Sequence, residues 1–79
     1  MNLATITKTV AELAPEAKDI RARDLGGAVY VLLAEVEGRM RAVQFARFGL
    51  YGDPVLALGL VWNKSDLQIA AEIAKELRK

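Results

Sequence analysis

The chain has 79 residues, 53% of them apolar, and a formal net charge of +1, so we expect one ordered domain over residues 1–79 whose core only just offsets the entropy of folding. Because cysteine and histidine are both absent, disulfides, thiolate nucleophiles and the commonest zinc ligands are excluded. The balanced charge argues against a strong DNA-attracting field and against an acidic mimic of DNA.

The N-terminal segment predicts a helix that ends near Ala14, because Pro15 would clash with a continuing helix. Thr9 and Glu12 have the spacing of a capping box, although Thr5 or an earlier residue is an alternative start. Residues 1–10 show no signal peptide, and no run approaches the length of a membrane span, so a soluble cytoplasmic protein is expected. Apolar residues recur at helical spacing at Ile6, Val10, Leu13 and Ala17.

The middle of the chain changes to an alternating period, which predicts strands. Residues 28–37 are rich in β-formers and end in a Glu-Gly turn, and residues 39–48 follow at once, so the two predict an antiparallel hairpin. Residues 54–62 predict a further strand that begins with a proline. Residues 19–25 favour a strand over a helix and run into a Gly-Gly turn.

The C-terminal segment predicts an amphipathic helix from Ser65 to Arg78. Ser65 and Gln68 fit a capping box, and Asp66 lies in the first turn, where the helix dipole favours an anion. From the broad apolar face of this helix we expect Leu67, Ile73 and Leu77 to be core residues.

The predicted fold class is therefore α+β. An antiparallel meander of three or four strands is flanked by an N-terminal and a C-terminal helix. The order is α-β-β-β-β-α if residues 19–25 form a strand, and α-β-β-β-α if they do not.

The candidate partner-binding residues lie on and just after the strand 39–48. Odd positions of a strand share one face, where arginines can contact phosphates and a phenylalanine can stack on a base. An exposed tyrosine between glycines makes a good contact anchor, although packing beneath its loop is the alternative. These candidates are Arg39, Arg41, Phe45, Arg47 and Tyr51.

Two other interpretations of this strand stay open. Glu35 and Glu37 precede the turn, so cross-strand ion pairs with Arg39 and Arg41 would make an ordinary solvated face. The run "RAVQFARF" also resembles part of the RNA-recognition-motif signature at its basic and aromatic positions. It lacks the glycine and one of the aromatic residues of that signature, and the helix-first order is different.

Apolar residues are in excess over what two short helices can bury. Residues 29–33 and 55–62 are apolar at nearly every position, a pattern typical of strands covered on both faces. At about 25 cal/mol per Å², leaving several large side chains wet would cost several kcal/mol. We therefore expect the second face to bind another chain. A homodimer is the simplest solution, because symmetry supplies the partner, and a foreign protein is the alternative.

Residues that would carry catalysis are scarce. Ser65 is the only serine and is already explained as a helix cap, and Gly26-Gly27 is too short for a phosphate loop. Nucleophilic and acid–base catalysis both need a positioned, tuned group. We expect no enzyme, no catalytic residue, no cofactor and no metal.

In general form the whole chain resembles the anti-CRISPR proteins, the small phage-encoded inhibitors of bacterial defence. The resemblance rests on a very short, single-domain α+β chain without catalytic residues and on no motif. It implies a protein that sterically occludes a CRISPR effector subunit, often where target DNA binds, in the host cytoplasm. Many members are acidic DNA mimics, and this chain departs from that pattern. The expected function is thus a non-catalytic protein-binding module. The alternative is a nucleic-acid-binding module using Arg39, Arg41, Phe45 and Arg47, with weak affinity because of the low net charge.

Overall fold

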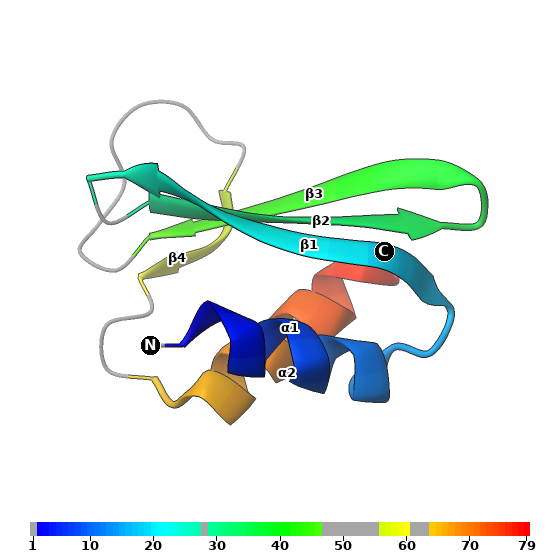
Figure 1. Cartoon of the computed structure of the whole chain (residues 1–79), viewed down its shortest axis with the longest axis horizontal. Coiled ribbons are helices and arrows are strands. Elements are labelled where there is room, and N and C mark those ends of the chain that lie inside the picture. Colours follow the sequence, from blue (N-terminus) through cyan, green and yellow to red (C-terminus); the bar gives the residue numbers. More distant parts are fainter. Residues whose placement is uncertain (1, 28, 47–55, 61–63) are drawn as a thin grey trace.

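The computed structural model describes residues 2–27, 29–46, 56–60 and 64–79. Its elements are α1 (Leu3–Leu13), β1 (Ala17–Gly26), β2 (Val29–Val36), β3 (Arg39–Ala46), β4 (Leu56–Leu60) and α2 (Asp66–Leu77). The predicted α+β class and the order α-β-β-β-β-α are confirmed, and residues 19–25 are part of β1. Figure 1 shows two layers, with the sheet above and both helices below.

The sheet has the order β1-β2-β3-β4. Strands β1, β2 and β3 form the predicted antiparallel meander, whereas β4 lies parallel to β3 and pairs with it at Gln44 and Ala46. The direction expected for this last strand was therefore wrong. Apolar periodicity predicts that a strand exists, but it does not carry the direction in which the strand adds to its neighbour.

The turn between β2 and β3 fixes which residues share a face. Glu37 and Gly38 have φ values of 52° and 77°, the positive values that a two-residue hairpin turn of the right twist requires. The register is continuous from this turn, so Leu32 lies opposite Val43 and Tyr30 lies opposite Phe45. Residues directly opposite on antiparallel strands share a face.

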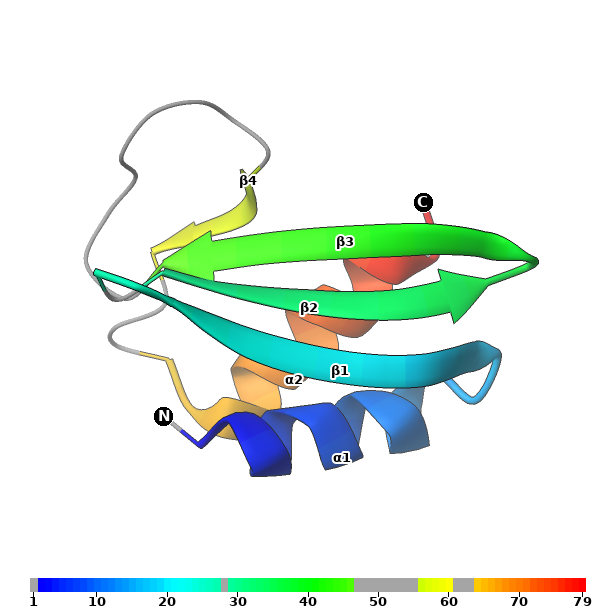
Figure 2. The same ribbon diagram turned by 45° about the horizontal axis from the view of Figure 1, so that its top comes forward.

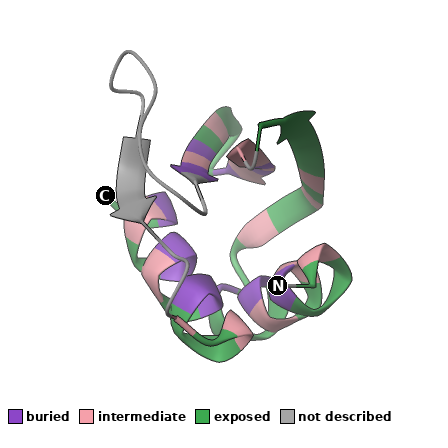
Figure 3. Cartoon of the chain, turned by 90° about the vertical axis from the view of Figure 1, so that its left-hand side faces the viewer, coloured by how far each residue is buried: buried purple, intermediate pink, exposed green. Residues whose placement is uncertain are grey.

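The core lies between the sheet and the helices. Leu32 and Phe45 are fully buried, and the ring of Phe45 stacks on that of Tyr30 with centroids 5.6 Å apart. Figure 3 shows the buried residues of both helices turned towards the sheet. The helices contribute Ile6, Val10, Ile69, Ala70, Ile73 and Leu77 to this core.

The start of α1 differs from the predicted capping box. Asn2 is the N-cap, and its side chain accepts a hydrogen bond from the Thr5 amide at 3.1 Å. The Thr9 hydroxyl instead donates to the Thr5 carbonyl oxygen inside the helix. Ile6 and Val10 are buried as predicted, but near the other end Leu13 is 39% exposed and Ala14 is buried in its place.

The predicted capping box of α2 is confirmed. The Gln68 amide donates to Ser65 Oγ at 3.2 Å, and the Ser65 amide donates to Gln68 Oε1 at 2.9 Å. Ile73 and Leu77 are core residues as expected, but Leu67 is 63% exposed. The apolar face of α2 is wider than the surface that the sheet and α1 cover, and Leu67 falls outside the covered part.

Candidate functional site

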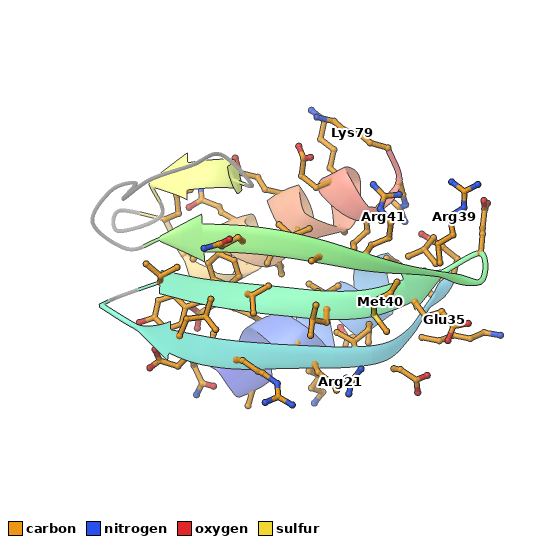
Figure 4. All side chains as sticks on the ribbon, turned by 90° about the horizontal axis from the view of Figure 1, so that it is seen from above. Arg21, Glu35, Arg39, Met40, Arg41 and Lys79 are labelled. Atoms are coloured by element: carbon orange, nitrogen blue, oxygen red, sulfur yellow. The ribbon has the colours of Figure 1, made fainter. Side chains whose placement is uncertain are left out.

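The face of the sheet opposite the helices is not covered by any described residue (Figures 1 and 4). Along β2, Leu32, Ala34 and Val36 are buried against the helices, so the alternate residues point the other way. The residues opposite them on the neighbouring strands lie on the same side. Val31, for example, has Arg23 of β1 opposite it on one side and Gln44 of β3 on the other. We call this surface the open face: Lys18, Arg21, Arg23, Val29, Val31, Leu33, Glu35, Met40, Ala42 and Gln44.

The open face has an apolar centre and a cationic edge. Val31 and Leu33 are half-buried in β2, and Met40, which lies opposite Glu35 on β3, is 56% exposed. Arg21 and Arg23 are exposed along β1, as is Lys18 at its start. The carboxylate that this face contributes from β2 is that of Glu35, so cations outnumber anions on it.

Phe45 is not a surface residue, contrary to the prediction of a stacking or contact role. Its exposed fraction is 0%, because the odd positions of β3 turn towards the helices. A base or a partner side chain cannot reach this ring in the folded chain. Arg47 and Tyr51, the other two candidates after it, lie outside the described residues.

Arg39 and Arg41 share the inner side of β3 with Phe45 but lie at the hairpin end, where α2 finishes (Figure 4). Arg41 Nη1 donates to the Lys79 carbonyl oxygen at 2.8 Å, and Nη2 donates to that of Glu76 at 3.4 Å. Arg41 thereby joins β3 to the end of α2 and to Lys79, which follows it. Of the five predicted contact residues, the structure brings these two together.

The expected ion pairs across the hairpin do not form. The register places Arg39 opposite Val36 and Arg41 opposite Ala34. Glu35 lies opposite Met40, on the open face, so its carboxylate and the Arg41 guanidinium are on different sides of the sheet. The ion pairs found among the described residues join Lys64 to Glu72, Arg78 to Glu16 and Lys79 to Glu76.

A half-open cleft of about 630 Å³ lies where the hairpin meets the end of α2. Arg78 Nε donates to Glu16 Oε1 at 2.9 Å beside it, and this hydrogen bond lowers the pKa of Glu16. Glu16, Arg78 and Lys79 are far from the hairpin arginines in the chain, so no local sequence pattern predicts that they meet there. The residues lining the cleft are Glu16, Val36, Glu37, Arg39, Arg41, Leu77, Arg78 and Lys79.

Within the described ranges, no three His, Cys, Asp or Glu side chains gather in a way that would hold a metal ion. Neither of the two described helices has the length and apolar character needed to cross a membrane. Comparison with known protein families, with curated proteins and with solved structures finds no match for this chain. The open face and the cleft are thus the features from which a function has to be inferred.

Proposed function

We propose that this chain is a non-catalytic protein-binding module whose open face docks on an apolar surface with an acidic rim on another protein. The observation that carries the proposal is an uncovered sheet face with valine and leucine at its centre and a row of cations along one edge.

The apolar centre supports an interface rather than a solvated face. An antiparallel sheet with one face in water usually places polar residues on that face. Here Val29, Val31 and Leu33 occupy these positions on β2, and Met40 adds a further apolar side chain to the same face, opposite Glu35. Fully covering one such side chain contributes about 1.5–3 kcal/mol. A partner that covers this centre therefore gains the burial that the helices provide on the other side.

The charge supports a foreign partner over a second copy. A two-fold dimer with β1 stacked over β1 would bring the Arg21 and Arg23 rows together, and like charges in contact are unfavourable. A dimer with β1 over β3 would place the same arginines over Met40, Ala42 and Gln44, which offer no carboxylate. An acidic rim on a different protein would pair with them, and so we prefer it to the homodimer expected from the sequence.

The charge of the open face and the burial of Phe45 bear on the two functions expected from the sequence, inhibition of a CRISPR effector and nucleic-acid binding. Target-DNA channels of CRISPR effectors are positively charged, so the cationic edge does not favour occlusion of such a channel. Inhibition of an effector stays a prediction, which titration with purified effector complexes tests. The nucleic-acid alternative loses its stacking residue, because Phe45 is in the core.

Site-specific crosslinking in the cells that make the protein tests the proposal. A photoreactive amino acid replaces Leu33 on the open face, and a matched control carries it in place of Leu67, which is exposed on the helix layer. We expect an adduct with one foreign protein from position 33 and not from position 67. An adduct of twice the chain mass would show a homodimer instead, and equal adducts from both positions would overturn the docking surface.

Charge variants then test the chemistry with the purified crosslinked partner. Val31→Glu and Arg23→Glu should each weaken binding at least about tenfold, because one puts a charge into the apolar centre and the other repels an acidic rim. Leu67→Glu and Lys8→Glu make the same two changes on the helices and should bind like the parent. If Arg23→Glu binds unchanged, the partner surface is not acidic.

A further inference from the structure

We propose that the cleft at the hairpin end is a second binding site, one that takes a small molecule bearing a phosphate monoester. The site does not include the open face, and it stands or falls independently of the protein-binding function. Figure 4 shows Arg39, Arg41 and Lys79 gathered at this corner of the molecule.

The cleft is built from segments that meet only in the folded chain. The β2–β3 hairpin supplies Glu37, Arg39 and Arg41, the end of α2 supplies Arg78 and Lys79, and Glu16 follows α1. Val36 and Leu77 form an apolar floor, and both are buried. Its volume of about 630 Å³ lies within the range of small-molecule pockets.

Two guanidinium groups in this cleft, those of Arg39 and Arg41, have no carboxylate side chain as a partner among the described residues. Arg78 is paired with Glu16, and Lys79 is paired with Glu76. Arg41 donates to main-chain oxygens of Glu76 and Lys79 and to no carboxylate side chain, and the described contacts of Arg39 include no hydrogen bond or ion pair. A phosphate monoester carries close to two negative charges near neutral pH. Guanidinium groups bind such an oxyanion through paired, charge-assisted hydrogen bonds.

The end of a helix normally repels anions, since its carbonyl groups carry partial negative charge. At the end of α2 the guanidinium of Arg41 lies against the Glu76 and Lys79 carbonyl oxygens. That contact offsets the partial negative charge of these oxygens, so the helix end no longer opposes an anion that Arg39 binds.

The shape favours a small ligand over a nucleic-acid strand. Among the described residues β4 pairs with β3 at Gln44 and Ala46, away from the arginine end of that strand. This arginine end lines the cleft together with the end of α2. The cations therefore surround a hollow rather than following an extended groove. The described residues of its lining include no aromatic side chain on which a base would stack.

The test is a titration of the ¹⁵N-labelled protein with inorganic pyrophosphate at low salt, followed by amide chemical shifts. We expect saturable shifts at Gly38, Arg39, Arg41 and Lys79, with a Kd of about 1 mM or tighter. Arg39→Gln removes one charge-assisted contact and should weaken binding about tenfold. The matched control Arg23→Gln, exposed on β1, should leave the affinity unchanged. Glu37→Gln removes a carboxylate from the lining and should strengthen binding.

Shifts that never saturate, or an equal loss of affinity in Arg23→Gln, would overturn the site, because either result describes a diffuse counterion effect. Unchanged affinity in Arg39→Gln would also overturn it. A second titration compares phosphoserine with a short oligothymidylate that has no terminal phosphate. Binding of phosphoserine alone supports a monoester site. Equal or tighter binding of the oligonucleotide would show that the cleft takes phosphodiesters instead.

Discussion

The two faces of the sheet are made by alternate residues of the same strands, yet one face is buried beneath the helices and the other is open. Leu32 is fully buried beneath the helices, while its chain neighbour Leu33 is half-buried on the open face. On β3 the same contrast separates Phe45, at 0% exposure, from Met40, at 56%. The difference shows that apolar character does not decide which side of a strand is core. The side on which the helices lie decides it.

Both helices lie on one side of the sheet and pack against each other there (Figure 2). The helices bury the side chains on one face of the sheet, such as Leu32 and Phe45, and no described residue covers the other face. The apolar excess of the sequence is thus concentrated on a single surface. The following predictions, taken from the largest expected effect to the smallest, test the contrast between these faces.

Phe45→Ala and Met40→Ala truncate the same strand on opposite faces. We expect the loss at Phe45 to cost about 3–5 kcal/mol of unfolding free energy, because the ring is fully buried and leaves a cavity. The change at Met40 should cost about 0.5 kcal/mol, as for ordinary surface positions. Urea unfolding of both variants measures this. Similar losses at the two positions would mean that the faces are not distinguished as described.

Leu32→Ala and Leu33→Ala make the same change at adjacent residues of β2. Leu32→Ala should cost about 2–5 kcal/mol, while Leu33→Ala should cost about 1 kcal/mol, because its side chain is only half-buried. The effects on binding should be reversed between the two variants. Leu33→Ala should weaken binding to the partner, and Leu32→Ala, where it still folds, should leave the affinity unchanged. Urea unfolding and a binding titration together check the pair.

On the face that the helices cover, β3 carries arginines instead of apolar residues at its hairpin end. Arg41→Ala tests whether that end of β3 holds α2 in place. The loss of its hydrogen bonds to the end of α2 should cost about 1 kcal/mol. Arg39→Ala serves as the matched control and should be nearly neutral, because Arg39 is exposed. Thermal unfolding of the two variants compares them. An equal effect of both changes would argue that Arg41 does not hold α2.

Glu16→Gln tests the ion pair that ties the end of α1 to that of α2, and it is the smallest effect. Arg78 lowers the pKa of Glu16 through a hydrogen bond. A lowered pKa in the folded chain gives stability that is present above about pH 4.5, the ordinary value of a glutamate, and is lost as pH falls through the folded pKa. Thermal unfolding midpoints of parent and variant should therefore differ slightly near pH 6 and converge near pH 3. A difference that persists in acid would exclude the ionised pair as its cause.

The elements whose signals are local could be predicted from the amino-acid sequence. The capping box at Ser65, the Glu37-Gly38 turn and the alternation of β2 and β3 were predicted because each depends on backbone hydrogen bonds and side-chain period within a few residues. The excess of apolar residues on the strands was likewise visible in the sequence, and it predicted that one face would lack cover.

Features that depend on contacts between distant segments could not be predicted from the sequence and are known only from the tertiary structure. A strand's period shows that Phe45 and Arg41 share a side, but only the position of the helices shows that this side is the core. In the same way, seven apolar residues on α2 made a stripe wider than its contact, so Leu67 was misplaced. Sequence pattern alone did not give the parallel direction of β4 or the meeting of Arg39 and Arg41 with Arg78 and Lys79. These contacts depend on how the helices and the sheet pack together, and the sequence pattern of a single strand or helix does not contain that information.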